Sequence, residues 1–330
     1  MMKNKYTFVV VMLVCILVAS FGFTSVYLNA ESKGKSEEKL HIVTSFYPMY
    51  IACLNLVDHV DNVELDNLSE PQTGCLHDFQ LTPQDMKLLS KADVFVVNGG
   101  GIENFISDVA TSYPELEIVE ACDGIALLSE EGHEEHEEHE EHEEDDNHEE
   151  EDNHQHVHDT EGNAHAWMSV CCYRQMVQNI TNELCRIDSE NAEKYRDNFE
   201  SYDKKLASLE KEIDKIKEET AGKNVIIFHE AYEYVACDLE MNVTYTLDLD
   251  EERAVSAGEI SEVISSEESD DVQVILAEDL YGKKVSETVC SEVDVEIIYI
   301  NPLNKGEYDK DSYINGMTYN IEKLEQAINK

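Results

Sequence analysis

Histidines are the side chains of this sequence whose type and placement could do chemistry. The chain has 13 of them, and eight lie between residues 130 and 161. The other five are His41, His59, His77, His165 and His229. Neutral imidazole is a ligand for zinc and other borderline divalent metals, so histidines brought together by the fold would predict a metal site.

Three of these five histidines lie where predicted strands end or where loops leave a predicted sheet. His229 ends the apolar run of residues 225–228, His77 follows the second predicted strand, and His165 follows an acidic segment. Ligands of open α/β sheets bind outside the carboxyl ends of the strands, so a histidine at such a position points toward a binding site. We expect the other two histidines, His41 and His59, to be structural or surface residues.

The acidic segment, residues 130–161, is the second feature that could bind metal. It holds 18 acidic residues, eight histidines and no lysine or arginine. Such dense like charge without an apolar face cannot form a packed core, and it predicts a disordered loop. A charge run is usually a solvated spacer, but regularly spaced imidazoles beside carboxylates add weak metal binding to that interpretation.

Two series of short β-rich runs, alternating with helical patterns, must position these residues. The first series predicts strands at residues 41–47, 62–68, 93–99 and 117–122, and helices at 49–57, 83–92 and 103–112. The second predicts strands at residues 224–229, 242–248, 272–279 and 295–301, separated by helices and closed by a helix at 311–330. This alternation is typical of an α/β protein with two (β/α)4-type lobes and parallel sheets.

One long helix is predicted between the two series, at residues 189–220, where apolar residues recur at steps of three and four. We expect it to be a stiff connection and not a hinge. The predicted organisation is an N-terminal lobe at residues 38–188, this linking helix, and a C-terminal lobe at residues 222–330.

The first 30 residues predict export, because Lys3 and Lys5 precede an apolar run at residues 8–30. The run is also long enough to span a bilayer, so cleavage after Ala30 and an uncleaved membrane anchor both remain open. Lipidation of Cys15 is the weaker option, because the small residues of a lipobox are missing before it. Eight further cysteines permit disulfides in an exported protein but require none, and buried free thiols are expected at positions such as Cys53 and Cys237.

The net charge of −48 argues against nucleic acid as a partner, because phosphate binding needs clustered basic residues and the chain has 24 in all. Cations are the natural ligands of such a chain.

Six short motifs follow one another in a characteristic order. They are HIVTSFYP at residues 41–48, HDFQLTP at 77–83, VNGGGIE at 97–103, HAWMS at 165–169, FHEAY at 228–232 and AED at 277–279. In this order they resemble the cluster of solute-binding proteins that serve zinc and manganese ABC importers. The resemblance covers the chain from about Leu40 to the C-terminus, and it implies a metal site in a cleft between two α/β lobes.

The resemblance implies three metal ligands, His77 and His165 from the first lobe and His229 from the second. Tetrahedral zinc asks for one more ligand. Many family members take it from a carboxylate after an Asn-Pro-Leu turn, where this chain has Asn304. Water is our preferred fourth ligand, and Glu278, Asn304 or a histidine of the acidic segment are the alternatives.

The chain departs from the family pattern elsewhere too. Leu81 replaces the first proline of the second motif, and Asn163 and Ala164 replace the Asp-Pro before His165. Trp167, the only tryptophan, is expected to pack beside the ligand loop without contacting the ion.

The function that the resemblance implies is capture of zinc outside the cytosol, by a monomer that delivers it to a membrane permease with its ATPase. The third histidine ligand stands where manganese-type relatives carry a glutamate. Carboxylate-rich sites suit manganese, so a histidine at this position favours zinc as the metal. A manganese-type binding protein of the same family remains an alternative. An extracellular zinc buffer or adhesin is another. A zinc hydrolase is disfavoured because no HExxH-like motif places a general base beside the histidines, and we expect no enzyme activity.

Overall fold

The computed structural model describes residues 39–69, 79–129, 162–247, 249, 255–278, 282–289 and 295–328. The chain divides into two compact units, residues 1–40 and 41–330, and the second carries the fold. The predicted signal or anchor segment, His77 and the acidic segment lie outside the described residues. None of the helices in the described ranges is both long and apolar enough to cross a membrane.

The first sheet contains four strands in the order β2-β1-β3-β4. The strands are β1 (Leu40–Thr44), β2 (Val63–Asn67), β3 (Val94–Val97) and β4 (Glu117–Glu120). Strand β3 pairs in parallel with both β1 and β4. The intervening helices are α2 (Tyr47–Leu56), α3 (Pro83–Leu89) and α4 (Ile106–Ser112).

The second sheet repeats this arrangement in the order β6-β5-β7-β8. Its strands are β5 (Asn224–Ile227), β6 (Asn242–Thr246), β7 (Val274–Ala277) and β8 (Glu296–Tyr299), and all its pairings are parallel. Helices α7 (Tyr232–Asp238), α8 (Ala257–Asp270) and α9 (Gly282–Val289) lie between them in sequence. The prediction of an α/β protein with two parallel sheets is confirmed.

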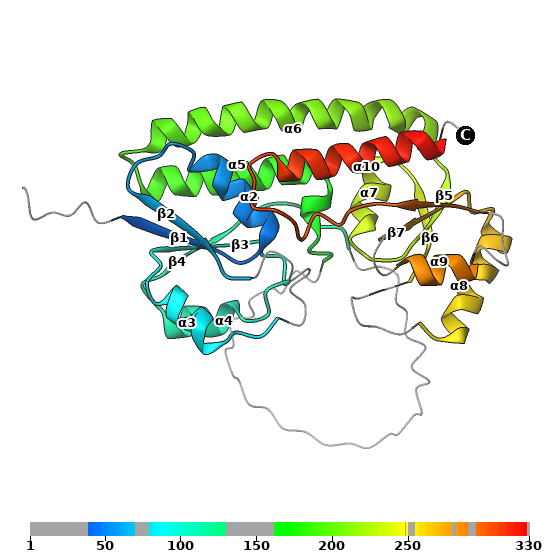
Figure 1. The fold of residues 1–330 in the computed structure, drawn as a ribbon, viewed down its shortest axis with the longest axis horizontal. Helices are drawn as coiled ribbons and strands as arrows, with labels where there is room; N and C mark the ends of the chain where they lie inside the picture. Colours follow the sequence, from blue (N-terminus) through cyan, green and yellow to red (C-terminus); the bar gives the residue numbers. More distant parts are fainter. Residues whose placement is uncertain are drawn as a thin grey trace, which may run out of the picture. The chain divides into compact units, whose positions relative to one another are not determined.

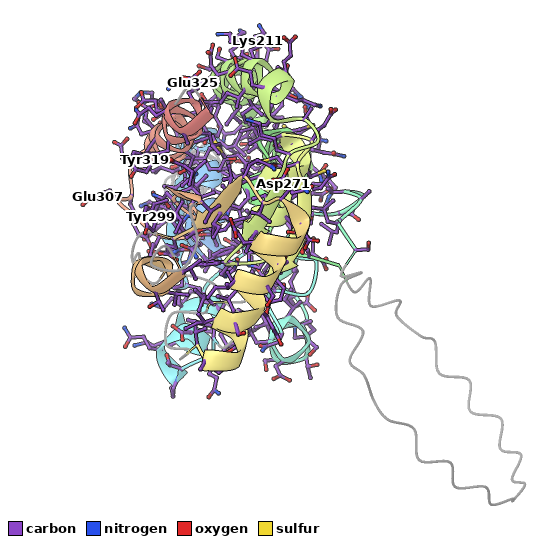
Figure 2. All side chains as sticks on the ribbon, turned by 90° about the vertical axis from the view of Figure 1, so that its right-hand side faces the viewer. Lys211, Asp271, Tyr299, Glu307, Tyr319 and Glu325 are labelled. Carbon is purple, nitrogen blue, oxygen red and sulfur yellow. The ribbon has the colours of Figure 1, made fainter. Side chains whose placement is uncertain are left out.

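Alternate residues of each sheet enter cores on opposite faces, as the strand period of two requires. In the first sheet, Val43, Phe95 and Val97 pack with Leu89 of α3 and Val109 of α4. In the second, Ile226 and Ile275 pack with Val263 of α8 and Val289 of α9. Figure 1 shows α3 and α4 beside the first sheet and α8 and α9 beside the second. Asp271, labelled in Figure 2, ends α8 in the left-handed region with φ of 51°.

The predicted linking helix is α6 (Ala192–Thr220), which is 29 residues long. At about 1.5 Å per residue it spans roughly 45 Å. It packs against α2, against α5 (Val170–Ile187) and against the C-terminal helix α10 (Ser312–Ile328), which lies alongside it in Figure 1. Helix α5 is an element that was not predicted, although its buried residues recur at helical spacing: Tyr173, Met176, Val177, Ile180 and Leu184.

Two predicted element boundaries were wrong for physical reasons. Tyr47 was expected in a strand but begins α2, because Pro48 occupies the first turn, where a proline suits a helix. The helix expected from residue 103 begins at Ile106, because the buried side chain of Glu103 accepts hydrogen bonds from the turn before it.

All six cysteines in the described part of the chain are free thiols. Cys53 is fully buried in α2, as expected. The same expectation for Cys237 was wrong, because the last turn of α7 leaves its side chain exposed.

Candidate metal site

His165 lies in a short connection that is fixed on both sides. It precedes the 3-10 turn η1 (Ala166–Met168) and is itself fully buried. Ser169 then caps α5 by accepting a hydrogen bond from Cys172 N–H. Trp167 is also fully buried, and its Nε1–H donates to Pro302 O at 2.9 Å. The tryptophan therefore packs beside the loop of His165, as predicted, with its ring centroid 4.9 Å from that of His165.

Asn163 orients the ring of His165. Its Oδ1 lies 2.9 Å from His165 Nδ1 and also accepts the backbone N–H of His165 at 3.0 Å. The oxygen can only accept, so Nδ1 carries the proton and the lone pair of the neutral ring is on Nε2. Donation from the other ring nitrogen to an oxygen is the usual way in which proteins fix a metal-binding histidine.

The amide group of Asn163 reaches into the second half of the chain. Its Nδ2 donates to Glu230 O and to Glu233 Oε2, each at 2.8 Å. A carboxylate at this position could not donate either bond. The asparagine that replaces the family's aspartate therefore links the loop of His165 to the start of α7, a role that no local sequence pattern indicates.

His229 follows β5, at the carboxyl end of that strand, as predicted. It is half-buried, and its Nδ1 accepts the backbone N–H of Ala231 at 3.0 Å. With the lone pair on Nδ1, a neutral ring carries its proton on Nε2. Ligation of a metal through Nε2 of His229 therefore requires the other tautomer and loss of this hydrogen bond, whereas His165 already has the required tautomer.

The structure brings His165 and His229 together from the two halves of the chain. Their ring centroids are 5.0 Å apart and their planes are nearly perpendicular, at 87°. Glu230 Oε1 lies 3.4 Å from His165 Nδ1, on the protonated side of the ring, so this carboxylate supports the orientation of His165 set by Asn163. Two imidazoles at this separation could supply two nitrogen ligands to a zinc ion.

A buried network supports the loop of His165 from the other side. Asn98 Nδ2 donates to Ala164 O at 2.9 Å, next to His165. Glu103 accepts hydrogen bonds from Ser45 Oγ, Asn98 N and Gly99 N at 2.7, 2.7 and 3.0 Å. Burial raises the pKa of Glu103 to about 7, and the three donors oppose that shift. Gly99 has φ of +79°, a conformation that glycine adopts without strain.

The two described candidates for a fourth ligand have different surroundings. Glu278 Oε1 lies 3.1 Å from Lys305 Nζ, and both side chains are largely buried. Ligation by Glu278 would therefore compete with this ion pair. Asn304 is buried, with 5% of its surface exposed.

A family model described as zinc-uptake complex component A, periplasmic, matches residues 42–327. The high-affinity zinc uptake system protein ZnuA of Bacillus subtilis is 32% identical and covers 99% of both chains. The zinc-binding protein AdcA of Streptococcus pyogenes is 26% identical over 88% of this chain, which spans only 56% of that relative. The manganese-binding lipoprotein MntA of Halalkalibacterium halodurans is 25% identical over the full length of both.

Solved structures agree with the fold. The metal-dependent lipoprotein YcdH of Bacillus subtilis has a TM-score of 0.67 at 25% identity and covers 87% of this chain and 98% of its own. FpvC of Pseudomonas aeruginosa, solved with Ni²⁺, has a TM-score of 0.71 at 23% identity and covers 88% and 97%. The match of the family model to nearly all of the fold, together with the likeness to the Bacillus subtilis protein, shows that this chain belongs to the ZnuA family, the component A proteins of zinc-uptake complexes.

Proposed function

We propose that this chain is the solute-binding component of an ABC importer, which captures zinc outside the cytosol and delivers it to a membrane permease with its ATPase. Zinc is the cargo and not a resident cofactor. Membership of the ZnuA family supports the class of function, and the names of its relatives in Bacillus and Streptococcus support zinc. Export by residues 1–30, by cleavage or as an anchor, belongs to this proposal, as does a monomeric state.

The proposed ligands are His77, His165 and His229, with water completing a tetrahedral site. The observation that carries the proposal is the approach of His165 and His229, whose ring centroids are 5.0 Å apart although 64 positions separate them in the sequence. Both lie in segments that the family resemblance identifies as ligand positions. We infer further that residues 38–188 and 222–330 act as two lobes joined by the linking helix.

The contrast between the two histidines fits capture and release. His165 is fully buried and held by Asn163 in the tautomer with its lone pair on Nε2. His229 is half-buried and loses the bond from Ala231 when Nε2 binds metal. In such a site His165 is preset, whereas His229 must rearrange before it binds the ion. The hydrogen bond from Ala231 that is lost costs about 1 kcal/mol, which weakens binding and so favours release of the ion.

Replacement of His229 by alanine tests the proposal. The His229→Ala variant should lose tight zinc binding in competition with a zinc chelator, because the remaining histidines lose a ligand from the second half of the chain. His59→Ala is the matched control, because the side chain of His59 is 93% exposed. Unchanged affinity in His229→Ala would remove this residue from the site and overturn the assignment.

A manganese-type binding protein is the second candidate. The observation that favours it is a relative that is 25% identical over the full length of both chains and is a manganese-binding lipoprotein. Elemental analysis of the protein purified without a histidine tag decides between the metals. A buffer or adhesin would lack neighbouring genes for a permease and an ATPase, and a zinc hydrolase would show turnover that disappears in His77→Ala.

A further inference from the structure

A second group of side chains of metal-ligating types lies on the two strands β2 and β1 at one edge of the first sheet. It consists of His41 at the start of β1 and of Glu64 and Asp66 on the neighbouring strand β2. One potential ligand atom of each residue lies within 4.8 Å of the others. His165 follows β4 and His229 follows β5 in the chain, whereas His41 is the second residue of β1.

The two carboxylates share one face of their strand. Glu64 and Asp66 are two positions apart, and side chains at this spacing point to the same side of a sheet. Leu68 continues this alternation and packs with Val43, which in turn lies two positions after His41. All three side chains of the group therefore belong to the face of the sheet that α3 covers.

The ring of His41 has an acceptor at both nitrogens. Nδ1 lies 3.1 Å from Lys91 O, just beyond the end of α3, and Nε2 lies 2.7 Å from Asp66 Oδ2. A backbone carbonyl only accepts, so Nδ1 carries the proton. Nε2 of a neutral ring then presents a lone pair to a carboxylate oxygen, which is unfavourable unless a cation lies between them. That cation is either a proton on the ring or a metal ion.

Hydrogen bonds to Asp93 hold the backbone of His41 in place. Its backbone N–H donates to Asp93 Oδ2 at 2.8 Å, and its O accepts from Asp93 N–H at 2.9 Å. A ligating histidine that donates its other nitrogen to a backbone carbonyl is the arrangement that proteins use to orient metal ligands. The side chain of His41 is 15% exposed and that of Asp66 is 45% exposed, so an ion can reach the group from solvent.

The geometry points to a second binding site for a divalent cation of the zinc type, formed by His41 Nε2 and the carboxylates of Glu64 and Asp66. Zinc–ligand distances of about 2.0–2.2 Å place tetrahedral ligands roughly 3.4 Å apart. The 2.7 Å between His41 Nε2 and Asp66 Oδ2 must widen by less than 1 Å. One imidazole and two carboxylates, partly exposed, make this site weaker than a three-histidine site.

The metal would join the first two strands at the beginning of the fold. Its ligands come from β1 and β2, and β2 is the edge strand of the sheet. The competing explanation is that a proton occupies the place of the metal and that His41 and Asp66 form an ordinary ion pair.

Zinc titration of the full chain, with ¹⁵N-labelled histidine side chains observed by NMR, distinguishes these explanations. The resonances of His41 are assigned from their loss in His41→Gln. Zinc should shift the Nε2 resonance of His41 at lower concentrations than those at which the eight histidines of residues 130–161 respond. In Asp66→Asn and in the more exposed Glu64→Gln, that response should move to zinc concentrations about 10-fold higher or more.

His59 is the internal control, because it lies in the same half of the chain, its side chain is 93% exposed, and its Nε2 lies 3.8 Å from Asp58 Oδ2. The site is overturned if His41 responds no earlier than His59 or the histidines of residues 130–161, and the ion pair is then the explanation. If Asp66→Asn does not fold, the zinc response of His41 in Glu64→Gln decides between the metal site and the ion pair. Retention of the His41 response in His229→Ala would show that this site is independent of the proposed transport site.

Discussion

Asn163 fixes the ring of His165 through a hydrogen bond of 2.9 Å between Asn163 Oδ1 and His165 Nδ1. The same side chain donates to Glu230 O and Glu233 Oε2. One amide group thus sets the tautomer of a proposed ligand and joins the two halves of the chain. An amide can do both because it carries an acceptor oxygen and two N–H donors, whereas an aspartate at this position could only accept.

Replacement of Asn163 by aspartate should separate these two tasks. The aspartate still accepts from His165 Nδ1, so zinc affinity should change by less than about 10-fold. Both donations from Nδ2 are lost and a negative charge faces Glu233, so the free energy of unfolding should fall by about 1–3 kcal/mol. Urea unfolding measures stability, and chelator competition measures affinity.

Two further variants complete this test. Asn163→Leu removes the acceptor as well, and it should lower both stability and zinc affinity. Asn182→Asp changes an exposed asparagine of α5 and should have little effect on either. If Asn163→Asp is as stable as the wild type, the hydrogen bonds from Asn163 to Glu230 and Glu233 contribute nothing to the free energy of unfolding.

The fold could be predicted from the sequence because strand and helix periods are strong local signals. The buried face of α6 was recognised from residues such as Tyr202, Leu206 and Ile213, and all of these are buried. The start of α4 could not be predicted, because it depends on the hydrogen bonds of Glu103 to Asn98 and Gly99, which form only when the turn is built. Local periodicity carries no information about such contacts.

The candidate site could be predicted only in part for the same reason. The sequence identifies His165 and His229 by their motifs, and the structure brings them together. The role of Asn163 depends on Glu230 and Glu233, about 70 positions away, and no local pattern reports such a pairing. His41 was interpreted as a structural or surface residue, because its partners Glu64 and Asp66 lie on another strand.

Deletion of residues 132–158 tests the prediction for the acidic segment, which lies outside the described residues. The deletion should leave the single tight zinc site and the weaker site proposed at His41, remove the weak sites of the segment itself, and slow zinc capture at low ionic strength. The reason is that dense negative charge concentrates cations nearby, an effect that salt screens over a Debye length of about 10 Å at 0.1 M. Isothermal titration and stopped-flow capture measure these effects.

The same deletion tests the fourth ligand. Water as the fourth ligand predicts an unchanged affinity of the tight site. If the tight site disappears with residues 132–158, a histidine of that segment completes the coordination, and the preference for water is wrong.

Asp238, the last residue of α7, should make stability depend on pH. Its Oδ1 accepts from Ser169 Oγ at 3.0 Å, which links α7 to the start of α5. Burial raises the pKa of Asp238 to about 6, while the hydrogen bonds from Ser169 and Val170 oppose the shift. The unfolded chain has a pKa of about 3.9 at this residue, so the folded state binds the proton more tightly. Its contribution to stability is therefore fully present below about pH 4 and is lost as pH rises through about 6.

An uncharged side chain at residue 238 should remove this loss. Asp238→Asn retains an oxygen that accepts from Ser169 and Val170, and it should be more stable than the wild type by about 1–3 kcal/mol at pH 7–8, with the difference vanishing near pH 4. Urea unfolding from pH 4 to pH 8 measures the free energy of unfolding of both proteins. The titration of all other carboxylates is common to the two and cancels in the difference. Asp197→Asn, an exposed change on α6, should leave the pH profile parallel to that of the wild type. If Asp238→Asn also runs parallel, the carboxylate of Asp238 is well solvated in the folded state, and the link to Ser169 carries no dependence on pH.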